Sequence, residues 1–135
     1  MILGYTVGTF DLLHIGHLRL LENCRAKCDS LLVGINSDEI VIASGKQKPI
    51  IPVEQRVEMV CALKCVDNAW IEYSLDKMEA WLRHRYEKFF VGKDWKGTDH
   101  WLSIEAQFRD LGIEIVYLPY TQEVSSTLIR KWCKE

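Results

Sequence analysis

Short apolar segments alternate with helical patterns along the whole 135-residue chain, and this alternation constrains the fold more than any other feature. Five segments have the length and composition of buried strands, and they cover residues 2–7, 30–35, 69–72, 88–91 and 114–118. Apolar residues recur at helical spacing over residues 16–26, 38–43, 53–63, 76–86, 101–111 and 125–133. Strands that are separated by helices do not pair as hairpins, so the alternation predicts a parallel sheet.

A parallel sheet is normally covered by helices on both faces, and right-handed crossovers favour a doubly wound, Rossmann-like arrangement. A length of 135 residues suits one domain. We therefore expect a single α/β domain over residues 1–135, built on a five-stranded parallel sheet. Ligands of such folds bind beyond the carboxyl ends of the strands, where the strand order reverses. This rule directs attention to the residues after Val7, Ile35, Val91 and Leu118.

The charge balance excludes several partners. Nineteen acidic and 17 basic residues give a formal net charge of -2, which argues against a broad surface for nucleic acid or anionic membrane. No apolar run approaches the ~20 residues of a membrane span, and the N-terminus lacks the pattern of a signal peptide. We expect a cytoplasmic protein that handles any phosphate through a local site, without nucleic-acid or membrane partners.

The cysteines allow two interpretations. Cys24 and Cys28, like Cys61 and Cys65, are four residues apart and share a helix face, so a four-thiolate metal site is conceivable. However, Leu21, Cys24 and Cys28 continue one apolar stripe, and free cysteine packs as a small hydrophobe. Paired cysteines of zinc sites usually enclose two residues rather than three. We therefore favour core packing.

The segment after the first strand carries the clearest chemical signal. Residues 8–17 read GTFDLLHIGH, in which two histidines flank a glycine at the start of a helix. A helix N-terminus presents free N–H groups and a positive dipole, and imidazoles add two further donors. Gly16 lets the backbone approach a phosphate closely. The pattern predicts an anion site, with surface histidines at a helix start as the alternative.

This segment resembles the signature of the HxGH nucleotidyltransferases, and in particular the cytidylyltransferases. Those enzymes join a nucleoside triphosphate to a phosphorylated alcohol and release pyrophosphate. Further segments resemble motifs of the same family, in the same order: PVEQR with KCVD, VGKDWKG, and PYTQEVSST. Length and motif spacing resemble most the small, single-domain glycerol-phosphate branch.

The resemblance implies roles for individual residues. His14 and His17 serve the α-phosphate and the leaving group, and Lys46 closes over the phosphates. Arg56 is a candidate for the acceptor phosphate, and Asp11 either fixes the loop or holds Mg²⁺. The expected nucleotide-binding residues are Gly8, Thr9, Phe10, Asp11, Gly16, Lys64, Gly92, Asp94, Trp95, Ser125, Ser126 and Thr127. The expected substrates are CTP and a small phosphoalcohol, and the resemblance also implies a homodimer.

Some positions depart from the family pattern. Tyr120 replaces an arginine that contacts the triphosphate, Glu123 replaces a glycine, and Lys93 precedes Asp94 where the family has two acids. Arg130 or Lys64 are candidates to supply the missing charge. Two alternatives to a cytidylyltransferase therefore stay open: an adenylyltransferase of the same fold, and a non-catalytic nucleotide-binding module.

Overall fold

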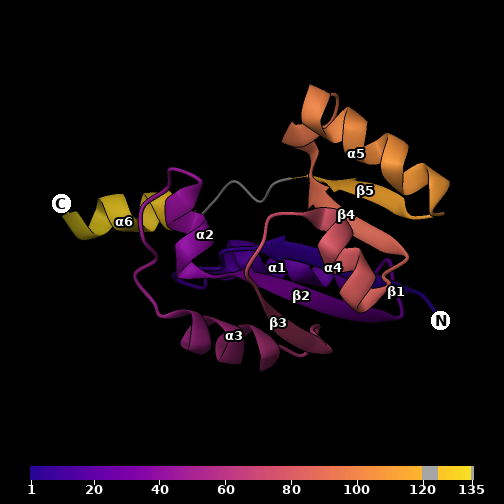
Figure 1. Cartoon of the computed structure of the whole chain (residues 1–135). Coiled ribbons are helices and arrows are strands. Elements are labelled where there is room, and N and C mark those ends of the chain that lie inside the picture. Colours follow the sequence, from indigo (N-terminus) through magenta and orange to yellow (C-terminus); the bar gives the residue numbers. More distant parts are fainter. Residues whose placement is uncertain (120–124, 135) are drawn as a thin grey trace.

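A parallel sheet of five strands forms the centre of the molecule in the computed structural model, which describes residues 1–119 and 125–134 (Figure 1). The strands are β1 (Leu3–Gly8), β2 (Ser30–Asn36), β3 (Asn68–Glu72), β4 (Lys88–Gly92) and β5 (Glu114–Leu118). The helices are α1 (Ile15–Arg25), α2 (Asp38–Ala43), α3 (Val53–Cys61), α4 (Lys77–His84), α5 (Asp99–Asp110) and α6 (Ser126–Lys134), with a 3-10 turn η1 (Lys93–Trp95). The order β3-β2-β1-β4-β5, with every pair parallel, confirms the predicted sheet.

The strand order reverses between β1 and β4. The chain first adds β2 and β3 on one side of β1, and then places β4 and β5 on the other side. β1 pairs with β2 from Leu3 to Gly8, but its register with β4 covers only Gly4 and Tyr5. The two strands therefore separate towards their carboxyl ends. This is the position at which doubly wound sheets bind ligands.

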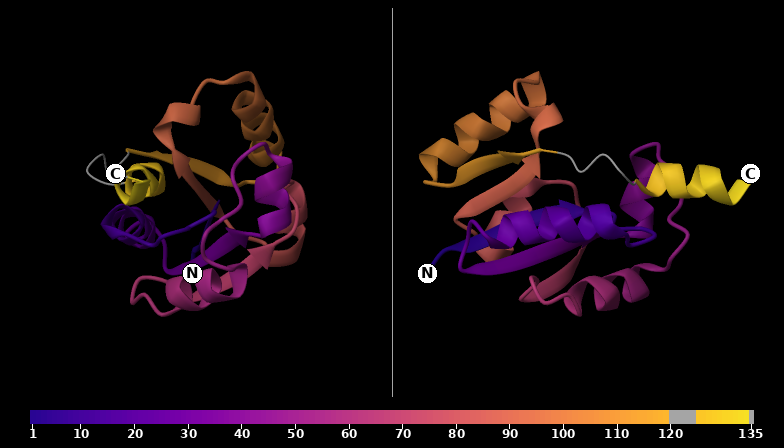
Figure 2. Two further views of the ribbon diagram at one scale, coloured as in Figure 1. Left: turned by 90° about the vertical axis from the view of Figure 1, so that its left-hand side faces the viewer. Right: turned by 180° about the vertical axis from the view of Figure 1, so that it is seen from behind.

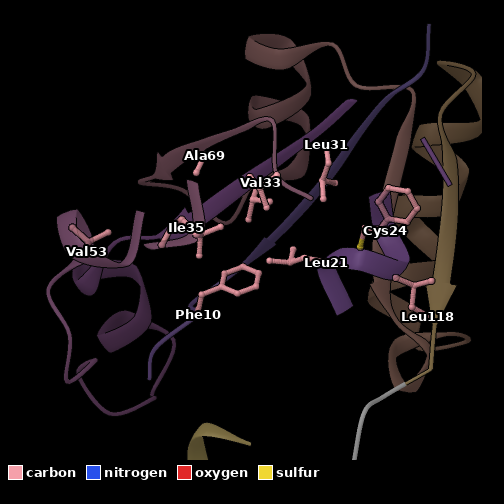
Figure 3. Packing of buried hydrophobic residues seen from close by; sticks show 12 residues of the cluster. Phe10, Leu21, Cys24, Leu31, Val33, Ile35, Val53, Ala69 and Leu118 are labelled. Atoms are coloured by element: carbon pink, nitrogen blue, oxygen red, sulfur yellow. The ribbon is translucent and has the colours of Figure 1, made fainter. Parts of the chain in front are cut away.

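Two hydrophobic clusters fix the helices to opposite faces of the sheet. Figure 3 shows the first cluster, to which Leu21 and Cys24 of α1, Val53 of α3 and Val33 and Ile35 of β2 belong. The second cluster joins α4 and α5 to the other face through residues such as Phe89 and Phe108. Helices thus cover both faces, as a doubly wound fold requires (Figure 2). α6 is different, because it extends outward beyond the carboxyl ends of the strands (Figure 1).

Most predicted helix boundaries differ from the structure by one or two residues, and two of these differences have clear local reasons. The helix expected over 76–86 ends at His84, since Arg85 adopts a left-handed conformation with φ 54°. Tyr86 then turns into the core, where its hydroxyl donates to the Lys77 carbonyl oxygen at 2.9 Å. The helix expected from residue 101 begins at Asp99, because the Thr98 hydroxyl caps it by accepting from the Trp101 N–H.

The centre of the sheet leaves no room for a side chain at Gly34. A Cβ atom at this position of β2 would collide with the Tyr5 hydroxyl, which reaches across the strand to the carboxylate of Glu72. Glu72 is buried and pairs with Arg83 and His84 of α4. The glycine therefore allows a buried polar cluster to connect β1, β3 and α4.

Three of the four paired cysteines pack in or against the core, whereas Cys61 is exposed. Cys24 is fully buried, and Cys28 and Cys65 pack against the same cluster. Over residues 1–119 and 125–134, no group of three or more His, Cys, Asp or Glu side chains is arranged to hold a metal ion. Within the same residues, no helix has both the length and the apolar character that crossing a bilayer requires.

Candidate active site

The loop that leaves β1 has an unusual backbone. Phe10 and Leu12 both adopt positive φ angles, of 52° and 51°, which side chains other than glycine rarely adopt. Phe10 is 5% exposed and belongs to the hydrophobic core, so its packing stabilises this conformation. The two left-handed residues turn the chain sharply between the end of β1 and the start of α1. As a result, Asp11, between them, is directed back into the protein.

Asp11 joins three segments of the chain. Its carboxylate accepts from the backbone N–H groups of Ile50 and Ile51, at 2.8 and 2.9 Å, and pairs with Arg130 of α6. Its main-chain carbonyl oxygen accepts from the Ser126 hydroxyl at 2.6 Å. Burial alone would raise the pKa of this carboxyl group, but the N–H donors and the arginine outweigh burial and lower it.

A metal ion does not fit Asp11 as a ligand. Both carboxylate oxygens already accept hydrogen bonds, and the Arg130 guanidinium neutralises their charge. Of the two roles expected for this residue, the structure supports the fixing of the loop.

His14 and His17 cap the N-terminus of α1 through a reciprocal pair of hydrogen bonds. The Nδ1 atom of His14 accepts from the Gly16 N–H at 3.0 Å, and Nδ1 of His17 accepts from the His14 N–H at 3.2 Å. Their rings stack, with centroids 3.8 Å apart. Because Nδ1 accepts in both rings, the neutral imidazoles carry their protons on Nε2. The site therefore holds two adjacent Nε2–H donors in a fixed orientation.

Burial keeps both imidazoles neutral. It lowers the pKa of His17 to about 4, with a further contribution from the neighbouring His14, while the Asp11 charge acts weakly in the opposite direction. Burial also lowers the pKa of His14. The Nε2 atom of His14 is buried without a hydrogen-bond partner among the described residues. An unpaired buried donor of this kind is costly unless a ligand pairs with it.

Two adjoining cavities lie at the carboxyl ends of the strands. The larger, of about 470 Å³, extends from the end of β1 to Gly92 and Trp95 on one side and to Asn36 and Lys77 on the other. The smaller, of about 280 Å³, contains His17 and Asp11. The residues common to both cavities are Val7, Gly8, Thr9, Leu20, Val41 and Lys46. The end of β1 and Lys46 therefore form the junction between the histidines and the larger space.

A third, basic cavity of about 610 Å³ adjoins the smaller one. It is lined by Lys46, Gln47, Thr127, Arg130, Lys131 and Lys134. Lys46 lines all three cavities, so one flexible ammonium group reaches the junction from the loop between α2 and α3. This concentration of positive charge at one end of the sheet suits a polyanionic ligand, although the whole chain is slightly acidic.

Arg56 lies in a different environment from the one predicted. Its side chain is fully buried, and four of its N–H groups already donate. The acceptors are the carbonyl oxygens of Ile51, Thr9 and Asn36 and the carboxylate of Asp38. Arg56, the candidate for the acceptor phosphate, therefore lines none of the three cavities and instead joins the ends of β1 and β2 to the loop before α3.

Lys64 is also not brought to the cavities. It lies in the connection between α3 and the start of β3, and it lines none of the three cavities. Asp94 is exposed and lines none of the cavities described, whereas its neighbours Gly92 and Trp95 line the larger one.

The three hydroxyl-bearing residues at the start of α6 have different surroundings. Ser126 lines the cavity that contains His17, and Thr127 lines the basic cavity. Ser125 instead caps the helix by accepting from the Leu128 N–H at 3.0 Å. Tyr120 and Glu123, which depart from the family pattern, lie outside the described residues.

The sequence analysis did not identify Asn36 and Lys77 as residues that line a cavity, and it did not predict that Arg130 pairs with Asp11. Asn36 is a polar residue at the end of an apolar strand, and Lys77 follows the end of β3. The rule that sites lie after the strand ends pointed to the position of Asn36, directly after Ile35, and applied to the third strand it would also have indicated Lys77. The pairing of Arg130 with Asp11 joins positions 119 residues apart, and no local pattern shows it.

Comparison with known proteins agrees with this geometry. The sequence profile of the cytidylyltransferase-like family matches residues 5–132. The chain is 34% identical over 127 residues to the glycerol-3-phosphate cytidylyltransferase of Bacillus subtilis (strain 168), which covers 93% of this chain and 92% of that protein. It is 39% identical over 116 residues to an FAD synthase of Methanosarcina acetivorans, which covers 86% of this chain and 76% of that protein.

A solved structure has the same fold. The lipopolysaccharide core biosynthesis protein from Thermoplasma volcanium GSS1 superposes with a TM-score of 0.76 at 25% identity, covering 92% of this chain and 99% of that one. A cavity at the switch point of a doubly wound sheet, with His17 in its lining and His14 stacked on His17, is the arrangement expected of a nucleotide-binding site. The chain belongs to the cytidylyltransferase-like family, and it is a nucleotidyltransferase.

Proposed function

We propose that this nucleotidyltransferase transfers CMP from CTP to a small phosphoalcohol, glycerol 3-phosphate or a similar compound, and releases pyrophosphate. The single observation that carries the proposal is the stacked pair of neutral, Nε2-protonated imidazoles, of which His17 lines a cavity at the strand ends and His14 packs against His17. The choice of CTP and of glycerol 3-phosphate draws support from the relative that is 34% identical over nearly the full length of both chains.

The chemistry needs positive charge and positioning more than covalent participation by the protein. The phosphate of the acceptor is largely ionised at pH 7, so its oxygen attacks the α-phosphorus without a general base. Negative charge develops on the α-phosphate oxygens and on the leaving pyrophosphate. The Nε2–H groups of His14 and His17 donate to those oxygens, and Lys46 supplies a mobile cation at the cavity junction. Arg130, which uses one of its N–H groups for Asp11, extends the donor set towards the β- and γ-phosphates.

Magnesium enters the proposal as the counter-ion that accompanies the triphosphate. Asp11 does not fit as its ligand, since its oxygens accept from Ile50, Ile51 and Arg130. The protein's contribution is therefore the set of fixed donors, and no step of the reaction is assigned to a protein-bound metal.

A second candidate is the transfer of AMP from ATP. The 39% identical FAD synthase favours it, since FAD contains an AMP unit. The third candidate, a non-catalytic nucleotide-binding module, is opposed by the intact capping geometry of His14, Gly16 and His17, which would serve no purpose beyond helix capping in a module of that kind.

A pyrophosphate-release assay distinguishes the three candidates. The protein is incubated with each nucleoside triphosphate, Mg²⁺ and a panel of phosphoalcohols that includes glycerol 3-phosphate and FMN. Release with CTP alone supports the proposal, and release with ATP alone supports AMP transfer. Tight nucleotide binding without release from any pair would establish the non-catalytic module.

Two variants of His17 separate its catalytic and structural roles. His17→Ala removes both the cap and the Nε2–H donor, and we expect a loss of about 10²–10³ in kcat, as for other single donors to developing charge. His17→Gln keeps an acceptor at the third helical position, where glutamine often closes a capping box. It should therefore retain the thermal stability of the wild type and still lose activity. Near-normal turnover in His17→Gln would contradict the mechanism.

We also propose that the protein acts as a cytoplasmic homodimer. An interface is supported by the large apolar side chains exposed along the edge strand β3 and just beyond it: Trp70, Tyr73 and Leu75. Light scattering coupled to size-exclusion chromatography tests the proposal, and a mass of 15.7 kDa at all concentrations would contradict it.

A further inference from the structure

The larger cavity contains a polar end that the proposed chemistry does not use. From the end of β1 it extends towards β2 and β3, where Asn36 and Lys77 line it. Neither residue lines the cavity that contains His17. Both also face a narrow space of about 10 Å³ beside it, so their polar groups lie near one another. This end of the cavity is therefore remote from the reacting phosphates.

Lys77 is a cation in an unfavourable place. It is the first residue of α4, where the helix dipole disfavours positive charge, and burial lowers its pKa although the neighbouring Asp76 partly counteracts this. Its ammonium group donates to the Leu75 carbonyl oxygen at 3.1 Å and lies 5.7 Å from the centre of the Trp101 ring. Over residues 1–119 and 125–134, no carboxylate lies within ion-pair distance of it. A partly buried cation without an anionic partner suits a ligand that brings one.

Asn36 offers a second unused polar group. It is the last residue of β2, and its carbonyl oxygen accepts from Arg56 at 2.9 Å, which fixes the backbone at this point. Its side-chain oxygen is buried and has no hydrogen-bond partner among the described residues. A buried acceptor is normally paired, so this one suits a ligand that carries a hydroxyl or another donor.

The nucleoside and the acceptor require different ends of the larger cavity. In the proposed reaction, the nucleoside lies towards Gly92 and Trp95, beyond β4. The end at β2 and β3 is then left for the acceptor. Apolar residues such as Val41 and Leu75 line the space between the two ends, and this region suits the carbon skeleton of a small molecule.

We infer that Asn36 and Lys77 form the specificity end of the acceptor site, and that the preferred acceptor is a small hydroxylated phosphomonoester with a second anionic group remote from its reacting phosphate. The inference rests on the proposed function for the direction in which the acceptor lies. Asn36 accepts a hydrogen bond from the acceptor's hydroxyl, and Lys77 binds the second anion, a carboxylate or a second phosphate. A phosphoalcohol with an uncharged tail satisfies only the first of these groups.

A matched pair of acceptors tests this inference. Glycerol 3-phosphate and 3-phosphoglycerate have the same length and differ mainly by a hydroxymethyl group in place of a carboxylate. We expect the wild type to prefer 3-phosphoglycerate by about tenfold or more, in KM and in calorimetric titrations without nucleotide. Lys77→Met keeps the apolar stem and should abolish the preference, while the KM for the nucleotide changes by less than about twofold.

Two further variants make the readout specific. Lys27→Met alters an exposed lysine that lines none of these cavities, and it should leave the preference intact. Asn36→Ala should lower affinity for 3-phosphoglycerate but not for 3-phosphooxypropanoate, which lacks the hydroxyl.

The inference is overturned if the wild type binds neither acceptor or does not discriminate between the pair. It is also overturned if Lys77→Met retains the preference, or if that variant changes the KM of the nucleotide instead. Failure of the proposed function is a separate result, namely no pyrophosphate from any nucleotide and acceptor. In that case the calorimetric comparison still decides the inference, because it requires no turnover.

Discussion

Replacing Arg56 by methionine tests the structural role that the fold gives to this arginine. The side chain is fully buried, and its loss leaves three carbonyl oxygens and the Asp38 carboxylate without donors. An unsatisfied buried polar group costs about 1–3 kcal/mol, and removing one partner of a buried ion pair costs about 3–5 kcal/mol. Because water will reach some of these groups, we expect Arg56→Met to lower the free energy of unfolding by about 3–5 kcal/mol.

The assay is urea unfolding, followed by tryptophan fluorescence and by circular dichroism. Arg19→Met is the matched control: Arg19 forms an exposed pair with Glu22, so its loss should cost less than about 0.5 kcal/mol. If Arg56→Met does not fold, Arg56→Lys supplies the comparison, since lysine keeps the charge but cannot reproduce the planar set of donors.

A double-mutant cycle isolates the ion pair. With Asp38→Asn in the background, Arg56→Met should cost at least about 1 kcal/mol less than in the wild type, since no buried carboxylate is then left unpaired. The opposite result would refute this reasoning: a variant with wild-type stability and a raised KM for the phosphoalcohol. Arg56 would then contact substrate, as the sequence alone suggested.

Three further outcomes follow from the structure. Because the pKa of His17 is lowered to about 4, the unfolded chain binds more protons than the folded one below pH 6.5. The free energy of unfolding should therefore fall by about 3 kcal/mol as the pH is lowered from 6.5 to 4. His17→Gln should reduce this pH dependence of the free energy of unfolding, measured by denaturant unfolding at each pH. Gly34→Ala places a methyl group against the Tyr5 hydroxyl and should lower stability by about 1–3 kcal/mol, with partial recovery on adding Tyr5→Phe; unchanged thermal unfolding would contradict the packing. Asp11→Asn removes the ion pair with Arg130 and should make α6 more sensitive to limited trypsin digestion, whereas an unchanged digestion rate would show that α6 does not depend on this pair.

The sheet was predictable from the sequence because its signal is local. Each strand is a short apolar run between helices. The ends of the five predicted strands differ from those of β1 to β5 by no more than one residue. The histidine pair was also predictable, since His14, Gly16 and His17 act within a single helical turn. The end of the helix before Tyr86 was not, because it depends on the burial of that side chain in the core.

The environments of the charged residues could not be predicted from the sequence, because they depend on the tertiary structure. Arg56 is an ordinary helical cation in the sequence, but its acceptors come from positions up to 47 residues away. The place of Lys64 follows from the direction of α3, which returns to the amino ends of the strands. The sequence does not single out Lys77, because a cation at a helix start becomes partly buried, and so unfavourable, only when α4 packs on the sheet.

The reciprocal caps at the start of α1 have a consequence for the direction of the reaction. Both Nδ1 atoms are committed to backbone N–H groups, and burial lowers the pKa of both imidazoles, so His14 and His17 stabilise charge as neutral donors without gaining or losing a proton. A site of that kind stabilises the same transition state from either side. In the proposed reaction the histidines leave each turnover in the protonation state in which they entered it, so synthesis and pyrophosphorolysis use the same form of the site.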